Sequence, residues 1–286
     1  MGEISINPKF NIHETYKKVR ILNPYRNGAA PAQGSYLLDT YPAAVAWSLR
    51  KLSGGYTGAA IRVRRSSDDT EQDIGFDGNG LDTAALLSFV GAGNGLVTTI
   101  YDQAGTGLNF TQTNPVRQGR IVNSGAVNTL NGKPVILRSV GPDGKYISTY
   151  APNDGAVVKG VFYVGANGGN PSVLLGSKAS ADFYYAAESG NSSTGTKDNG
   201  AFSQERKNGQ AWSYASRDDL YTDTLSQFLL SNNTDFGFSD NSLALGYNFL
   251  NSHLYAMFSF QELIIFENTT DHLDKETKIN SYYAIY

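Results

Sequence analysis

The feature that most constrains the fold is the stretch of residues 61–112, where short alternating runs meet glycine-rich turns. Ile61 and Val63 alternate with two arginines, which is the period-two pattern of a strand with one buried face. A second β-prone run ends in the Tyr-Asp-Gln sequence at 101–103, just before Gly105. Tight turns between short strands are typical of a β-sandwich. The block therefore predicts an architecture more sharply than a chemistry.

Polar residues of this block are predicted to hold its turns together. Asp102 stands where a strand enters a turn, so its carboxylate can accept hydrogen bonds from backbone amides two residues ahead. The arginines and aspartates at 64–69 are expected to pair with one another in a solvated turn. The predicted structural motif comprises Arg64, Asp68, Tyr101, Asp102, Gln103 and Gly105.

The composition agrees with many short strands, since glycine (31), tyrosine (18) and phenylalanine (14) are abundant and charged residues make up only 17%. We expect such strands from residue 97 to residue 266, with an Asn-Gly hairpin turn at 208–209. Three short helices are predicted, at residues 40–52, 83–90 and 272–286. The apolar stripe expected for the last helix comprises Leu273, Ile279, Tyr282 or Tyr283, and Ile285. The expected fold class is all-β, a sandwich with a few short helices.

The first 34 residues differ from the rest of the chain. A β-prone run near residue 20 gives way to small residues with Pro24 and Pro31, which is typical of an extended connector. We therefore expect residues 1–34 to be an N-terminal attachment arm and linker, and residues 35–286 to be a lectin-like β-sandwich domain. An arm of this kind takes its order from a partner protein.

Several classes of protein are disfavoured by composition. Without cysteine, disulfide frameworks and thiolate sites drop out. The first ten residues lack the pattern of a secretory signal and no apolar run is long enough to span a bilayer, so neither export nor membrane insertion is expected. Basic residues are scattered among prolines and strands, so no nucleic acid partner is expected. His13, His253 and His272 lack metal-ligand spacing.

The order of these elements resembles two groups of proteins. One is the catalytic domain of fungal α-L-arabinofuranosidase B, a concanavalin-like jelly roll with similar motifs to Arg-Ser-Ser-Asp at 65–68 and Tyr-Asp-Gln at 101–103. The other is a set of bacteriophage virion proteins, mostly tail or fibre components, with a near-identical block. The resemblance covers residues 36–286 at the level of the fold and is specific from Tyr41 to Gln112. It implies a concanavalin-like jelly-roll β-sandwich.

The resemblance to the arabinofuranosidase implies two carboxyl groups that face each other across the sugar. In that family the nucleophile is a Glu in an Asp-x-Glu-Asn context, the acid follows a Leu-Gly-x-Gly-Gly turn, and paired cysteines shape the pocket. This sequence has neither the Asp-x-Glu-Asn context nor a cysteine, and no carboxylate lies between Asp240 and Glu262. The chain is therefore expected not to be an enzyme. The acidic residues that remain as catalytic stand-ins are Glu188, Glu205, Asp218 and Asp219.

A sugar-binding surface needs exposed aromatic rings beside amide or carboxylate groups. Strand alternation turns at least one ring of each closely spaced aromatic pair outward, although a place in the core is the competing interpretation. The candidates for carbohydrate binding are Tyr184, Tyr185, Trp212, Tyr214, Tyr247 and Asn248. No cofactor is expected, but Asp73, Asp77 and Asp82 form an acidic loop whose oxygen atoms suit Ca²⁺.

The main functional expectation follows from the second resemblance together with the arm and the missing signal sequence. It is a bacteriophage structural virion protein, such as a tail fibre, spike or decoration component, that is made in the host cytoplasm and located in the virion. Residues 1–34 would contact other virion proteins, and the sandwich would bind host cell-surface polysaccharide, in a homo-oligomer such as a trimer. The two alternatives are a glycoside hydrolase of the α-L-arabinofuranosidase type and a ligand-free capsid or tail decoration protein.

Overall fold

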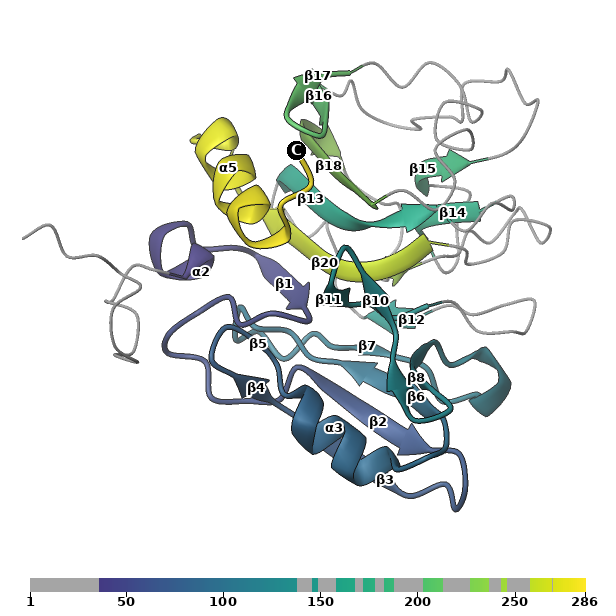
Figure 1. Ribbon diagram of the computed structural model, residues 1–286. Coiled ribbons are helices and arrows are strands. Elements are labelled where there is room, and N and C mark those ends of the chain that lie inside the picture. The colour runs from purple at the N-terminus through teal and green to yellow at the C-terminus, as the bar shows by residue number, and fades with distance from the viewer. Residues whose placement is uncertain are drawn as a thin grey trace, which may run out of the picture. The chain divides into compact units, whose positions relative to one another are not determined.

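Two antiparallel sheets dominate the computed structural model (Figure 1). The structure describes residues 36–137, 146–148, 158–167, 172–177, 183–187, 203–212, 227–236, 243–245, 258–268 and 270–286. In this part of the chain, apolar side chains from both sheets meet in one cluster, so the arrangement is a sandwich.

The six-stranded sheet has the order β1, β20, β13, β18, β16, β17. Its strands are β1 (Val45–Ser48), β13 (Val158–Asn167), β16 (Ser203–Lys207), β17 (Gln210–Ala211), β18 (Gln227–Phe236) and β20 (Phe258–Phe266). Neighbouring strands of this sheet lie far apart in the sequence. Strand β20, for example, pairs with β1 on one side and with β13 on the other.

The ten-stranded sheet has the order β15, β14, β19, β12, β7, β6, β2, β3, with β8 paired to β6 and β9 paired to β8. Its strands are β2 (Ile61–Arg65), β3 (Glu71–Ile74), β6 (Gly95–Ile100), β7 (Phe110–Thr111), β8 (Arg120–Asn123), β9 (Ala126–Val127), β12 (Tyr146–Ser148), β14 (Ser172–Ser177), β15 (Phe183–Ala187) and β19 (Leu243–Leu245).

Two small hairpins and a few short helices complete the described elements. The hairpins are β4 (Phe76–Asp77) with β5 (Gly80–Leu81) and β10 (Thr129–Leu130) with β11 (Lys133–Pro134). The helices are α2 (Leu37–Thr40), α3 (Thr83–Val90), α5 (His272–Tyr283) and the 3₁₀ turn η1 (Pro115–Arg117). The predicted all-β sandwich with a few short helices is confirmed.

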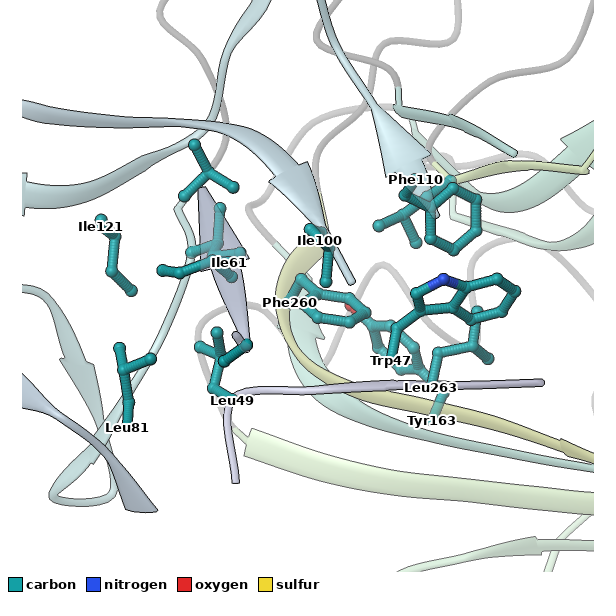
Figure 2. Close-up of a cluster of buried hydrophobic side chains, with 14 of the residues drawn as sticks. Trp47, Leu49, Ile61, Leu81, Ile100, Phe110, Ile121, Tyr163, Phe260 and Leu263 are labelled. Carbon is teal, nitrogen blue, oxygen red and sulfur yellow. The ribbon is translucent and has the colours of Figure 1, made fainter. Parts of the chain in front are cut away.

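The core between the sheets is built around Trp47, whose side chain is fully buried. Its ring centroid lies 4.2 Å from that of Phe110, and its indole Nε1 donates a 2.9 Å hydrogen bond to the carbonyl of Leu108. Ile100 and Leu263 extend the same cluster from the two sheets (Figure 2). A buried indole with its N–H satisfied adds a large apolar area at no polar cost.

A second apolar cluster lies on the other face of the six-stranded sheet, beneath α5 (Figure 1). There Ile279 and Tyr283 of the helix pack against Phe162 and Ile264 of the strands. The prediction of a closing helix is confirmed, but its expected stripe is wrong at Leu273, which is 59% exposed. The buried face instead comprises His272, Lys275, Glu276, Ile279 and Tyr283. Three of these five are polar, so the hydrophobic pattern alone pointed to the wrong first turn.

The prediction of a helix over residues 40–52 is wrong, because residues 45–48 form strand β1. Trp47 pairs with Leu263 of β20, and all four residues of β1 are buried. Ala46 faces the cluster under α5, whereas Trp47 faces the core between the sheets. A strand that is buried on both faces reads as a continuous apolar run, which periodicity alone does not distinguish from a helix.

Two local predictions are confirmed. Helix α3 begins after Asp82, whose carboxylate accepts a 2.8 Å hydrogen bond from the amide of Ala85. The hairpin β16–β17 turns at Asn208 and Gly209, where φ is 50° and 75°. Positive φ at both central residues is what a tight hairpin turn requires, and Asn-Gly adopts it at little cost.

The predicted N-terminal arm lies outside the described residues, so the domain boundary near residue 34 stays a prediction. Among the residues described, no helix has the length and apolar character needed to cross a membrane.

Candidate functional site

The Tyr-Asp-Gln turn is a dense hydrogen-bonded corner. The Asp102 carboxylate, only 4% exposed, accepts hydrogen bonds from the amides of Ala46, Ala104 and Thr106 at 2.8, 3.0 and 2.7 Å. The hydroxyl of Thr106 donates a fourth bond of 2.8 Å. The bond from Ala104 is the one that the sequence predicts, whereas Ala46 belongs to β1. Asp102 therefore joins the turn after β6 to the opposite sheet.

Gln103 braces the chain that leaves β1. Its side-chain nitrogen donates to the carbonyls of Ser48 and Arg50 at 2.9 and 3.0 Å, and its side-chain oxygen accepts from the amide of Leu52 at 2.9 Å. The side-chain amide thus makes three hydrogen bonds to the backbone, two as a donor and one as an acceptor. The residue is 3% exposed, so the geometry gives it a structural role.

Arg50 and Glu262 form a buried ion pair close to Gln103. The Arg50 Nε and Nη2 atoms donate to the two carboxylate oxygens at 2.7 and 2.9 Å, and the hydroxyl of Ser48 donates to the same carboxylate at 2.7 Å. Burial by itself lowers the pKa of Arg50, but Glu262 raises it, and the net shift is upward. Glu262 is fully buried, so this ion pair supports the fold and is not open to a ligand.

The arginines of the Arg-Ser-Ser-Asp turn are paired, as the sequence predicts. Arg65 donates to both carboxylate oxygens of Asp68 at 3.0 and 2.6 Å. Arg64 pairs with Asp69 and donates from Nε to the side chain of Gln118 at 2.8 Å. Because the acidic groups already have cationic partners, this turn has no arrangement of open carboxylates for a metal or a substrate.

The calcium candidates are engaged in other contacts. Asp73 accepts from Arg62 at 2.7 and 2.8 Å and from the hydroxyl of Tyr101 at 2.8 Å, and the hydrogen bond from Arg62 lowers the pKa of Asp73. Asp82 caps α3, and Asp77 lies in β4. In the part of the chain that the structure describes, no group of three or more His, Asp or Glu side chains is arranged to hold a metal ion.

Two groups of predicted sugar-binding residues lie on a strand of the ten-stranded sheet or, in the sequence, shortly after one. Tyr184 and Tyr185 lie on β15, while Tyr247 and Asn248 follow β19 and lie outside the described residues. Both strands pair antiparallel with β14, where Leu175 is the register partner of both Tyr184 and Leu245. The strands β15 and β19 therefore run in the same direction, and the chain leaves both at the same end of the sheet.

Trp212 belongs to the other sheet. It follows β17, packs against the core between the sheets, and has the ammonium nitrogen of Lys207 5.4 Å from its ring centroid. Tyr214 and the catalytic stand-ins Glu188, Asp218 and Asp219 lie outside the described residues.

Glu205, the one described stand-in, lines a cavity of about 650 Å³ between the β16–β17 hairpin and the start of α5. Arg206 lines the same cavity, and its Nε donates to Glu276 at 2.7 Å. The sequence did not indicate this cavity, because its walls are more than 60 residues apart. The polar residues at the start of α5 are the only sequence feature that could have indicated the cavity, but helix periodicity places polar residues on the solvent-exposed face. The groups that line it are Glu205, Arg206, Asp271, His272, Leu273 and Asp274.

A buried polar chain supports this cavity. The Nε2 atom of His272 lies 2.9 Å from the hydroxyl of Ser231, which donates to Glu276 at 3.1 Å. Burial, together with the charges of Arg206 and Lys275, lowers the pKa of His272 to about 4. His272 is therefore neutral near pH 7, and its ring nitrogen can donate to the hydroxyl of Ser231.

We expect the neutral state of His272 to make the fold sensitive to acid. The unfolded chain has an ordinary histidine pKa of about 6.5, so below that pH it binds a proton that the folded chain binds only near pH 4. Stability should therefore fall as the pH is lowered through this window. Urea unfolding between about pH 7 and pH 4.5 should show a shallower loss in His272→Gln than in the unaltered protein. Equal pH slopes in the two proteins would show that His272 does not contribute.

The comparisons with known proteins find arabinofuranosidases. The family model described as "Alpha-L-arabinofuranosidase B, catalytic" matches residues 36–212. Two similar solved structures are an arabinofuranosidase complexed with arabinofuranosyl-α-1,2-xylobiose (19% identity, TM-score 0.51) and a Glu-to-Gln mutant of a GH54 α-L-arabinofuranosidase soaked with 4-nitrophenyl α-L-arabinofuranoside (17% identity, TM-score 0.51). Each covers 86% of this chain, which spans 64% of their length. No curated protein sequence matches the chain.

The fold and the comparisons define the class first, an all-β, jelly-roll-like sandwich. The matched segment makes up more than half of the 286 residues. The chain belongs to the family of α-L-arabinofuranosidase B catalytic domains.

This membership corrects the main expectations from the sequence. The assignment to bacteriophage virion proteins is wrong, and with it the virion location and the tail and decoration roles. A partner contact through residues 1–34 stays a prediction. The expectation that the chain is not an enzyme is also wrong, because the matching family is one of glycoside hydrolases. The physical reason is that residues 61–112 hold the turns of the sandwich, as Asp102 and Gln103 do, and such corners serve any function. The prediction of a homo-oligomer stays a prediction.

One acidic residue of the chain shares part of the family's Asp-x-Glu-Asn context. Within the matched segment, Asp198 is the carboxylate that asparagine follows directly, in the sequence Thr-Lys-Asp-Asn at 196–199. An Asp in place of the Glu has the same carboxyl group on a side chain one methylene shorter. Residue 198 lies outside the described residues, between β15 and β16 in the sequence.

Proposed function

We propose that the protein is a glycoside hydrolase that releases α-L-arabinofuranosyl groups from polysaccharide. The observation that carries this proposal is the family match over residues 36–212. The solved structures with related folds were obtained with arabinofuranosyl ligands, which supports the choice of sugar. The chain leaves β15 and β19 at the same end of the ten-stranded sheet, which supports a sugar site there.

The proposed reaction uses two carboxyl groups. The nucleophile attacks the anomeric carbon as the bond to the leaving oxygen breaks, and the second carboxyl group gives that oxygen its proton. The second group then takes a proton from water, whose oxygen displaces the nucleophile and restores both residues. We assign the first role to Asp198, which asparagine follows as it follows the family's nucleophile, and the second to Glu188.

Glu188 is assigned the acid and base role because of its position. It follows Ala187, the last residue of β15, at the end of the sheet where the chain also leaves β19. The stretch after β19 has no carboxylate between residues 240 and 262, so the second carboxyl group has to come from another segment. Strand β15, which β14 separates from β19, leads directly into one.

The assay is release of 4-nitrophenol from 4-nitrophenyl α-L-arabinofuranoside. We expect the unaltered protein to release it, and Asp198→Asn to lower kcat/KM by more than about 100-fold, since the amide cannot attack carbon. Glu188→Gln should lower arabinose release from arabinan by a similar factor, since the amide cannot give the sugar leaving group its proton. Glu267→Gln is the matched control, because Glu267 is exposed at the end of β20 and should leave kcat/KM unchanged.

Three results would contradict this proposal or its residues. If the unaltered protein releases no 4-nitrophenol from this substrate, and no arabinose from arabinan, the hydrolase proposal is wrong. If the protein is active and Asp198→Asn keeps that activity, the nucleophile is assigned wrongly. If instead Glu205→Gln removes the activity, the cavity beside α5 is the catalytic site.

A further inference from the structure

The cavity between the β16–β17 hairpin and α5 extends beyond the matched family segment. The match ends at residue 212, whereas one wall of the cavity is the first turn of α5, from Asp271 to Asp274. The β16–β17 hairpin belongs to the six-stranded sheet, whereas β15, the strand that precedes Glu188 in the sequence, belongs to the ten-stranded sheet. The cavity is therefore formed by a different sheet from the one that leads to Glu188.

Arg206 is held in place at this cavity by two hydrogen bonds. Its Nε donates to Glu276 at 2.7 Å, and its Nη2 donates to the carbonyl of Gly209. A guanidinium group carries five N–H donors, so three remain within the part of the chain that the structure describes. The side chain is 20% exposed, and its open side lines the cavity.

The groups beneath Arg206 are buried and connected. Glu276 is 2% exposed, and its second carboxylate oxygen accepts from Ser231, which also contacts the ring of His272. His272 is 6% exposed and neutral near pH 7. Such a chain fixes the direction of the guanidinium before a ligand arrives, so binding has little ordering cost to overcome.

The charges of the cavity indicate the chemistry of its ligand. The carboxyl groups of Glu205, Asp271 and Asp274 line the cavity together with Arg206, and they oppose the entry of an anion. Arg206 in turn opposes a compact cation. A sugar is neutral, and its hydroxyl groups donate to carboxylates while they accept from a guanidinium. The exposed side chain of Leu273 adds an apolar surface for a ring face.

We propose that this cavity is a second sugar-binding site, apart from the catalytic one, in which Arg206 and the facing carboxylates hold a neutral sugar residue of the polysaccharide. A volume of about 650 Å³ is within the range of small-molecule sites. The choice of an arabinose-containing probe rests on the proposed function. The site itself rests on the cavity and on the buried network that supports Arg206.

The test uses ¹⁵N NMR of the full chain in the Asp198→Asn background, with arabinofuranosyl-α-1,2-xylobiose as the probe. We expect saturable shifts of the amides of Ala211 and Leu273, which border the cavity. Arg206→Gln should weaken binding, read from these two amides, by at least about tenfold, because charged hydrogen bonds to the sugar are lost. Arg62→Gln, which removes the exposed ion pair between Arg62 of β2 and Asp73, should leave the affinity unchanged.

A second variant guards against a loss of structure. Arg206→Gln also unpairs the buried Glu276, so Asp274→Asn, on the exposed side of the cavity, is measured beside it. The hydroxyl of Tyr41 donates to Asp274, and the side-chain oxygen of Asn can still accept that bond, so this variant should weaken binding with little change in Tm. The proposal is overturned if the two amides do not shift at millimolar probe, if they shift equally in Arg206→Gln, or if spermidine displaces the probe. If the unaltered protein shifts the same two amides with this probe but releases no 4-nitrophenol from 4-nitrophenyl α-L-arabinofuranoside, the proposed function is wrong while this site stands.

Discussion

Replacement of Asp102 by alanine is expected to lower the free energy of unfolding by about 3–5 kcal/mol. The carboxylate accepts four hydrogen bonds, three from backbone amides and one from a hydroxyl, in a position that is 4% exposed. Each donor that is left buried without an acceptor carries a desolvation cost of about 1–3 kcal/mol, partly relieved where water can enter. Urea unfolding followed by circular dichroism measures the loss.

Asp68→Ala is the matched control for Asp102→Ala. Asp68 also accepts hydrogen bonds within a turn, from Thr70 and Arg65, but its side chain is 43% exposed and water replaces the lost partners. We expect a much smaller loss there. If the two substitutions destabilise the protein equally, the joint between the turn after β6 and β1 contributes little.

The second large effect is expected at Glu262. Glu262→Leu should lower the free energy of unfolding by about 3–5 kcal/mol, because the guanidinium of Arg50 would remain buried without its carboxylate. The hydroxyls of Ser48 and Tyr283 would lose an acceptor as well, at 2.7 and 3.3 Å. The rings of Tyr282 and Tyr283, with centroids 5.1 and 5.6 Å from the guanidinium carbon, compensate only in part.

A double substitution separates the ion pair from the burial of its groups. Arg50→Met with Glu262→Leu replaces both charges by apolar side chains of similar length, and we expect it to be more stable than Glu262→Leu alone. The exposed pair Arg62 and Asp73 is the matched control, where the same treatment should change stability by only about 0–1 kcal/mol. A double variant as unstable as the sum of the two single variants would mean that the two groups do not interact.

Sequence periodicity predicted the strands that have one wet face. In β2, Ile61 and Val63 are fully buried while the arginines between and after them are accessible, so alternation is visible in the sequence. In β1, by contrast, both faces are buried, and its continuous apolar run led to the wrong prediction of a helix. The polar residues buried under α5, such as Lys275, were missed for a related reason. Lys275 is 1% exposed because Asn268 and the carbonyl of Thr270 accept its ammonium hydrogens at 2.8 Å.

The candidate site was predictable only in part. Aromatic residues on β15 and after β19 were selected from composition and spacing, and the register of β14 brings these two segments to one end of a sheet. The cavity beside α5 was not predictable, because Arg206 and Glu276 meet only through the packing of a terminal helix on a distant hairpin. The predicted functional class was wrong because the motif residues hold turns, and such residues occur in virion proteins and in arabinofuranosidases alike.

The sequence by itself determined the all-β class, the strands with one wet face, the Asn-Gly hairpin and the cap of α3, because each depends on residues that are neighbours in the chain. Only the tertiary structure decided that β1 is a strand, that Asp102 reaches across to it, and that Arg206 faces a cavity over a buried chain from Glu276 to His272. These features depend on contacts between segments far apart in sequence. Local propensity does not contain such contacts, and the burial that they create outweighs it.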